Sequence, residues 1–462
     1  NLTNAEADSS SFWNDTAPTS TEFTVGGDDD VNDFGDTYVA YLFAHNDGDG
    51  EFGPDGDQDI IKCGSYTGDG TTDGSNSINL GFEPQWIMIK KASEAANWNI
   101  YDNMRGVITN GSGNIDDHFL FPNLTNVEDT QARIAFNPTG FHLESSNGEV
   151  NQSSATYIYM AIRRGPLAAP DDATKVFGMQ DYTGGGDGPV TGFVTDFALF
   201  KNTPESAVES FITQTRLTGQ EYLLPSSTAA GGTLSNGAFD RMDGAGDTGL
   251  SGYNIWGWKR APSYFDVVGY TGTNSVQTLN HNLGVAPEMI WIKERDGVSD
   301  WKVFHSSIGA TKVLTLNTNA KSSTSSTWFN DTAPTATQFT IGTNSTINDS
   351  PLNYISYHFC TLDGISKVGG FSHTNGSTTD VSCGFSSGAR FVLVKRTDAD
   401  VFPAGWYVWD STRGIVSGNS PYLLLNSTDS EVTNTDYINP LSSGFQMDSG
   451  FITGDYIFYA IA

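Results

Sequence analysis

Short apolar segments, separated by runs of Gly, Ser, Thr, Asn and Asp, recur along the whole chain. In the clearest of them, at residues 157–162, bulky apolar side chains fall on both alternating faces, in the order YIYMAI. Apolar residues on both faces of a segment this short are typical of a strand buried inside a sandwich. The pattern therefore predicts many short strands joined by turns, and few helices.

These segments follow a fixed order that returns several times. A segment with an aromatic-Thr-Gly turn comes first, and a strand that ends in lysine, a segment that begins with tryptophan and a tyrosine-rich closing segment follow it. The closing segments lie at 38–43, 157–162, 253–258, 354–359 and 456–461, and the lysine-terminated segments lie at 86–90, 289–293 and 391–395. Such repetition predicts an array of one small folding module.

One stretch repeats without any substitution. Residues 14–19 read NDTAPT, and the same six letters return at 330–335, an offset of 316 residues (330 − 14). The chain holds five closing segments but four opening segments, so we expect residues 1–45 to be the C-terminal half of a module. We also expect the native protein to extend N-terminally; a half-module completed by another chain is the alternative.

The repeated landmarks set the predicted domain boundaries. They are a half-module at 1–45, an acidic linker loop at 46–62, module A at 63–164, a proline-containing linker at 165–175, module B at 176–260, module C at 266–361 and module D at 367–462. Module B diverges most, because it offers residues 193–201 in place of the usual lysine-terminated strand. Modules of about 100 residues are typical of small β-sandwiches. The sequence predicts an all-β fold, a tandem array of small antiparallel β-sandwich modules that forms an elongated chain.

The net charge of the chain limits the partners that it can bind. Fifty-four acidic residues against twenty-three basic ones give a net charge of −31. Such a surface repels phosphate, so we expect no binding to nucleic acid. The sequence has no run of about 18 apolar residues, so we expect no insertion into a membrane. The three cysteines lack metal-ligand spacing and fit free thiols, which suits assembly in a reducing cytoplasm.

Acidic residues cluster in turns, and one cluster suggests a metal site. Asp47, Asp49, Asp55 and Asp57 alternate with glycine and other small or polar residues in the linker loop. Calcium prefers several oxygen ligands on a flexible loop, so these four aspartates are the candidate calcium ligands. The spacing differs from that of an EF-hand. The alternative is that the acidic loops simply keep the surface hydrated.

No catalytic residues are predicted. The sequence has no HExxH, Gly-x-Ser-x-Gly or phosphate-loop motif, and we expect a non-enzymatic protein. Asp102 and Arg105 recur as Asp410 and Arg413 but are lost in module C, so we interpret them as turn contacts, with ligand binding as the alternative. Tryptophan recurs at one position of the module, and we expect core anchors there rather than sugar-stacking rings. These residues are Trp98, Trp301 and Trp406.

Several of these segments together resemble one known family. Residues 13–18, 82–90, 283–293 and 456–462 are similar to a repeated domain of unknown function found in large virion and tail-fibre-like structural proteins of marine bacteriophages, including cyanophages. The resemblance covers nearly the whole chain and is weakest in module B. It implies a location on the virion surface after assembly in the host cytoplasm. It carries no catalytic motif.

The expected function is therefore that of a virion structural protein, most simply part of a tail fibre or appendage that adsorbs to the host by multivalent binding. The expected partners are other virion proteins, a host-surface glycan or protein, and further copies of the chain in a homo-oligomer, for which a trimer is one candidate. Three alternatives remain: a capsid-decorating protein, a bacterial extracellular adhesin or surface filament, and a polysaccharide depolymerase that uses paired carboxylates.

Overall fold

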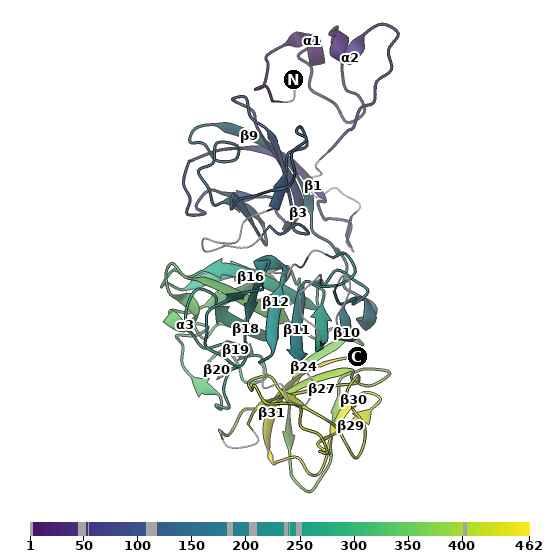
Figure 1. The fold of residues 1–462 in the computed structure, drawn as a ribbon, viewed down its shortest axis with the longest axis vertical. Helices are drawn as coiled ribbons and strands as arrows, with labels where there is room; N and C mark the ends of the chain where they lie inside the picture. Colours follow the sequence, from purple (N-terminus) through teal and green to yellow (C-terminus); the bar gives the residue numbers. More distant parts are fainter. Residues whose placement is uncertain are drawn as a thin grey trace.

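The computed structural model describes residues 3–44, 52–53, 55–107, 118–182, 188–202, 210–234, 239, 241–245, 252–400 and 404–462. Figure 1 shows that the chain runs from the half-module, through module A, to a larger body that contains modules B, C and D. Nearly all the regular structure is strand, and the paired strands of each sheet run antiparallel. The predicted all-β fold class is confirmed.

The strands of each module follow one another closely along the chain. Module A contains β1 (Ile61–Thr67), β2 (Ser77–Asn79), β3 (Pro84–Lys91), β4 (Trp98–Asp102), β5 (His118–Leu120), β6 (Asp129–Thr130), β7 (Ile134–Asn137), β8 (Gly140–Leu143) and β9 (Thr156–Arg163). The 3-10 turn η1 (Ala173–Lys175) leads into module B, which contains β10 (Phe177–Tyr182), β11 (Phe197–Asn202), β12 (Ile212–Thr215), η2 (Arg216–Thr218), β13 (Glu221–Leu223), β14 (Gly232–Thr233) and β15 (Tyr253–Trp258).

Modules C and D continue the series. Module C contains β16 (Phe265–Thr271), β17 (Gln277–Asn280), β18 (Met289–Glu294), β19 (Lys302–His305), β20 (Lys312–Thr315), β21 (Ser323–Thr324), β22 (Gln338–Ile341), the helix α3 (Ser345–Asn348) and β23 (Asn353–Phe359). Module D contains β24 (Ser366–His373), β25 (Thr379–Ser382), β26 (Phe391–Arg396), β27 (Trp406–Asp410), β28 (Leu423–Leu424), β29 (Ile438–Leu441), β30 (Gly444–Met447) and β31 (Gly454–Ile461).

One sheet topology recurs in all four modules. In module A the first strand β1 pairs with the closing strand β9, which pairs with the lysine-terminated strand β3, which pairs with β4. The corresponding orders are β10-β15-β11-β12, β16-β23-β18-β19 and β24-β31-β26-β27. The closing strand therefore lies inside the sheet, between two neighbours. Its side chains point alternately to the two faces of the sheet, and in modules C and D both faces are buried, which explains why its sequence is apolar on both.

A smaller second sheet covers the inner face of the large sheet in modules A, C and D. These sheets are β2-β8-β7, β17-β22 and β25-β30-β29. An equivalent aromatic pair bridges the two sheets in each of these modules, with ring centroids 6.0–6.4 Å apart: Tyr66–Phe141, Tyr270–Phe339 and Phe371–Phe445. Among the residues described for module B, the only ordered counterpart is an isolated bridge between Val190 and Gly244.

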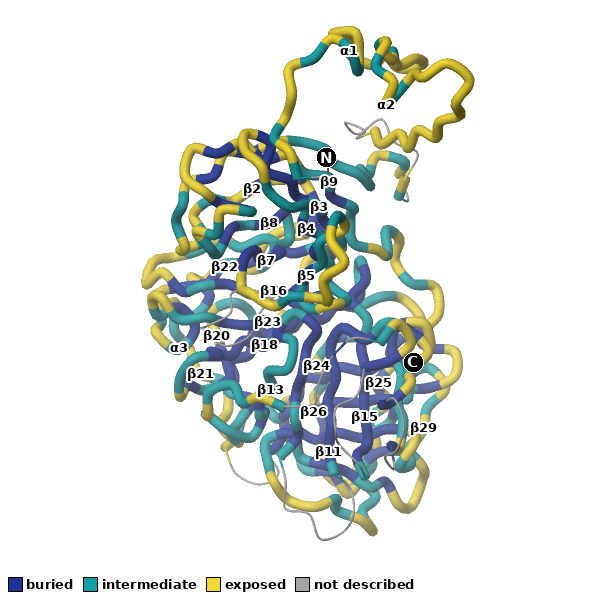
Figure 2. Tube along the Cα trace, turned by 45° about the horizontal axis from the view of Figure 1, so that its top comes forward, coloured by how far each residue is buried: buried dark blue, intermediate teal, exposed yellow. Residues whose placement is uncertain are grey.

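The outer faces of the large sheets of modules B, C and D meet in one shared hydrophobic core. Aromatic contacts join every pair of modules. Ring centroids lie 4.7 Å apart for Phe197 and Tyr357, 5.0 Å apart for Phe359 and Tyr459, and 5.5 Å apart for Trp258 and Phe391. In Figure 2 the strands β11, β15 and β26 of this body are mostly dark blue, because both of their faces are covered. The sequence did not predict that three modules share a core.

Hydrogen bonds run around these three modules in one direction. In each case a buried lysine at the end of the third strand of the large sheet donates to a backbone carbonyl of the next module: Lys293 to Thr228 at 3.4 Å, Lys395 to Asn319 at 3.2 Å and Lys201 to Thr428 at 3.5 Å. Modules C, D and B are thus linked head to tail in a closed ring, the relation expected of like units around a pseudo-threefold axis.

The half-module keeps the local structure of the matching part of module C. It contains the helices α1 (Ser10–Trp13) and α2 (Asp29–Asn32), of which α2 corresponds to α3. Asn14 and Asn330 both have positive φ, 51° and 52°, and each accepts a 2.8 Å hydrogen bond on its carbonyl oxygen from a threonine two residues later. The exact sequence repeat thus encodes the same turn twice.

The closing strand predicted at residues 38–43 is not formed. These residues have no strand assignment, and Tyr41 and Leu42 are 81% and 73% exposed. In the complete modules the closing strand is held on both sides by other strands of its own sheet. Residues 1–45 contain neither of those neighbours, so among the described residues this segment lacks the two partner strands that hold the other closing strands. Among the described residues, no helix is long and apolar enough to cross a membrane.

Candidate functional site

The predicted calcium site falls partly outside the described residues. Asp47 and Asp49 lie there, whereas Asp55 and Asp57 are described and exposed. Within the described ranges, no three His, Cys, Asp or Glu side chains are grouped so that they could hold a metal ion. Calcium binding by this loop stays a prediction.

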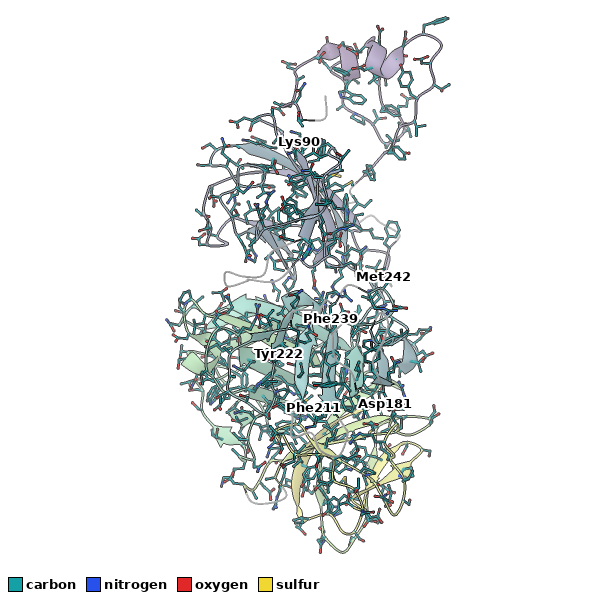
Figure 3. The ribbon with its side chains drawn as sticks, viewed as in Figure 1. Lys90, Asp181, Phe211, Tyr222, Phe239 and Met242 are labelled. Carbon is teal, nitrogen blue, oxygen red and sulfur yellow. The ribbon has the colours of Figure 1, made fainter. Side chains whose placement is uncertain are left out.

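A cleft with a volume of about 1070 Å³ lies between modules A and B. Module A lines it with the turn that follows β4 and with side chains near β5 and β6. Module B contributes Phe239 and Met242, which Figure 3 places at the edge of module B that faces module A. Because the two walls come from distant parts of the chain, the sequence pattern did not predict this cleft.

Four charged or polar side chains form a network on the module A wall. The Arg105 guanidinium bonds to Asp102 at 2.8 Å and to Glu128 at 3.0 Å, and His118 Nδ1 lies 2.7 Å from the other oxygen of Glu128. Partial burial acts to raise the pKa of Glu128, but the hydrogen bonds from His118 and Arg105 outweigh it and lower that pKa. Glu128 therefore stays ionised at neutral pH and suits hydrogen-bond acceptance rather than proton donation.

The predicted turn contacts are present. Asp102 Oδ1 accepts the backbone N–H groups of Met104 and Arg105, and Asp410 accepts those of Thr412 and Arg413 in the same way. In module C, which lacks the aspartate, His305 Nδ1 accepts the N–H of Ser307 at 3.2 Å. The third partners, Glu128 and its counterpart Glu431, were missed because they lie about twenty residues away in sequence.

The same network has different surroundings in modules A and D. In module D the Asp410 and Arg413 side chains are 1% and 6% exposed, and Asp410 accepts a 3.1 Å bond from the indole N–H of Trp256 in module B. In module A the equivalent Arg105 is 38% exposed and faces the cleft. The module A network thus keeps hydrogen-bonding capacity that a ligand with hydroxyl or carboxylate groups could use, beside the apolar side chains of Phe239 and Met242.

A buried ionic cluster joins modules A, B and C at one end of the cleft. Glu83 of module A lies 2.8 Å from Arg260 and 3.1 Å from Arg164. Arg260 is 1% exposed and also lies within 3.7 Å of Asp196 and Asp266. Burial acts to lower the pKa of Arg260, but these carboxylates raise it above its ordinary value, so the charge is retained. The cluster holds module A against the other modules.

The predicted tryptophan anchors divide into two groups. Trp301 and Trp406 are 0% and 1% exposed, so they are core anchors as predicted, and the core in which they lie is the one shared by modules B, C and D. Trp98, at the same position of module A, is half-buried. The difference arises because the outer face of module A has no neighbouring module packed over it as modules B, C and D have.

A protein-family model matches most of this chain. The model of a domain of unknown function, DUF7483, matches residues 1–166 and 191–462. The chain belongs to this family. Among curated proteins, no sequence matches this chain. The family match spans the half-module, module A, most of module B and all of modules C and D, so the divergent module B is part of the same family domain. It assigns no activity to the cleft.

Proposed function

We propose that this DUF7483 protein is a non-enzymatic structural protein of a bacteriophage virion, part of a tail fibre or similar appendage that adsorbs to the host surface. The observation that carries the proposal is the way the modules are joined. Three modules share one core, and the buried cluster around Arg260 holds the fourth against them. A body built in this way, with three modules closed in a ring and the fourth fixed against them, keeps its shape under load.

The chemistry of the surface supports this role. A net charge of −31 keeps neighbouring appendages apart and soluble. The cleft between modules A and B offers both hydrogen-bonding groups and apolar side chains, which is the combination that sugars require. We therefore assign host-surface glycan binding to this cleft. Several copies on one particle would give firm attachment from individually weak contacts.

The experiment has two parts. Gold-labelled antibodies against the chain, imaged on intact particles, should mark an appendage rather than the capsid shell. The purified chain should also compete with particles for adsorption to host cells. Arg105→Ala should weaken this competition at least tenfold, and Lys175→Ala, at an exposed position away from the cleft, should leave it unchanged. Capsid labelling, or equal competition by both variants, would overturn the proposal.

A further inference from the structure

The outer face of module A's large sheet is apolar and only partly covered. Strands β1, β3, β4, β5 and β9 each contribute to it. Its residues are half-buried, apart from the exposed Ile158: Ile61, Met88, Trp98, Ile100, Leu120, Ile158, Met160 and Ile162. In Figure 2 the strand β9 is largely teal and yellow, whereas the equivalent strand β15 is dark blue. A contiguous apolar sheet face of this kind marks an interaction surface.

Each position of this face has a counterpart in the shared core of the other modules. Ile158 follows the first tyrosine of its closing strand, as Ile355 and Ile457 do in modules C and D. Ile158 is 42% exposed, but Ile355 and Ile457 are 0% and 2% exposed. Trp98 likewise corresponds to the buried Trp301. Module A therefore carries the surface that modules B, C and D use to form their ring, without the neighbours that cover it there.

The loop after β3 already makes the backbone contacts of such a ring. The N–H of Glu6 donates to Ala92 at 2.7 Å, and the N–H of Ala96 donates to Thr3 at 2.9 Å. Between modules B and C the same pair of bonds joins Gly231 to Arg295 and Ser299 to Thr228, each at 2.8 Å. The spacing on the receiving loop is identical, since Ala92 and Ala96 correspond to Arg295 and Ser299. This loop of module A is thus shaped to receive the edge of a neighbouring module.

Module A also carries the edge that such a loop receives. Asn123 accepts the backbone N–H of Trp98 at 2.9 Å, as Asn317 accepts that of Trp301 at 3.0 Å. Two residues beyond Asn317, the carbonyl of Asn319 receives the ring lysine of module D. The matching segment of module A ends near Val127, whose side chain is 86% exposed. Both halves of a head-to-tail contact are therefore present on one module, as a closed ring of identical units requires.

We propose that the outer face of module A binds two further copies of this chain, so that three A modules form a ring like the ring of modules B, C and D. In this trimer the segment after Asn123 of the next copy takes the place of residues 3–6 on the loop at 92–96. Trp98 becomes buried, as Trp301 and Trp406 are. The proposal concerns assembly alone and does not depend on the virion assignment.

The test is the oligomeric state of the full chain. Light scattering after size exclusion, and sedimentation velocity over a range of concentrations, should give three times the chain mass. Met88→Asp and Ile100→Asp each place a charge on the face and should reduce the mass to that of one chain. Both positions are already partly exposed in the single chain, so the variants should keep the parent circular dichroism spectrum. Val298→Asp, at an 80% exposed position of module C, is the matched control and should stay trimeric.

Other outcomes would overturn the proposal. A parent chain that remains monomeric at every concentration would show that copies of this chain do not cover the face. A trimer that survives both Met88→Asp and Ile100→Asp would place the contact elsewhere, and a dimer would contradict the ring. A trimer lost equally in Val298→Asp would show that the effect of the charge is not specific to this face.

Discussion

Trp301 of module C donates its indole N–H to the carbonyl oxygen of Leu224 in module B, across 3.0 Å. Trp406 of module D makes the same contact with Thr315 of module C, across 3.1 Å. One position of the repeated module therefore packs within the core and ties its own module to the next. Because modules B, C and D share this core, we expect them to unfold in a single cooperative transition.

Trp406→Ala should lower the free energy of unfolding by about 3–5 kcal/mol, since it removes a buried aromatic side chain and leaves a cavity. Urea denaturation would measure the loss of unfolding free energy. Calorimetry would show whether modules B, C and D still melt together. Trp13→Ala, at a 56% exposed position of the half-module, is the control and should have little effect. Separate melting of module D in the parent chain would contradict the shared core.

Glu83→Gln should weaken the junction between module A and the other modules. The change leaves Arg260 and Arg164 buried with one carboxylate fewer, and breaking a buried ion pair typically costs about 3–5 kcal/mol. Limited proteolysis should cut the linker at 165–175 faster in the variant than in the parent. Asp171→Asn removes an exposed ion pair with Lys175 and should not change the cleavage rate. Equal rates in all three proteins would show that the cluster does not hold module A in place.

The stability of the ring should depend on pH through Lys395. Burial lowers the pKa of this amine to about 7, and an unfolded lysine titrates near 10.4. Between these values the unfolded chain binds more protons than the folded chain, so this contribution to stability grows as pH rises and is lost below about pH 7. Lys395→Met removes the titrating amine and therefore this pH-dependent contribution to stability.

The measurement compares the unfolding free energy of the parent and of Lys395→Met between pH 6 and pH 9.5. The variant should gain relative to the parent as pH falls, whatever its absolute stability. Lys312→Met, at an exposed position, should follow the parent at every pH. A constant difference between Lys395→Met and the parent would mean that the buried amine does not titrate as expected.

Tyr354→Phe tests the two hydrogen bonds that join the Tyr354 hydroxyl, at the start of the closing strand β23, to the backbone at Ser345 and Asp349. The Tyr354 hydroxyl accepts the N–H of Asp349 at 2.8 Å and donates to the carbonyl of Ser345 at 3.0 Å. Its loss leaves both groups without this partner, which should cost about 1–3 kcal/mol in the unfolding free energy.

The half-module supplies the matched control for these two hydrogen bonds. Tyr38 makes the same two hydrogen bonds to Asp33 and Asp29, each at 2.8 Å, but its side chain is 47% exposed. Water can replace the hydroxyl there, so Tyr38→Phe should leave global stability unchanged. Chemical denaturation of both variants would show the difference, and equal effects would contradict the role of burial.

Much of each module could be predicted from the chain because its signals are local. The aromatic-Thr-Gly turns, the alternation of apolar residues and the tyrosines of the closing strands all act within a few residues. The same locality explains the turn contacts of Asp102 and Asp410, whose partners lie three residues or fewer away. Glu128 and Glu431 were missed because a local residue pattern does not indicate a contact with a carboxylate about twenty residues away.

The sequence by itself determined the module: its strands, their order and the turns between them, because adjacent residues decide which backbone conformations are accessible. It also showed that residues 38–43 have the composition of a closing strand. Whether that composition becomes a strand depended on neighbours, and without them the segment has no strand assignment and is exposed. Tertiary structure alone decided that modules B, C and D share a core and that module A meets module B at a cleft, because apolar faces of similar composition do not specify which surface will cover them.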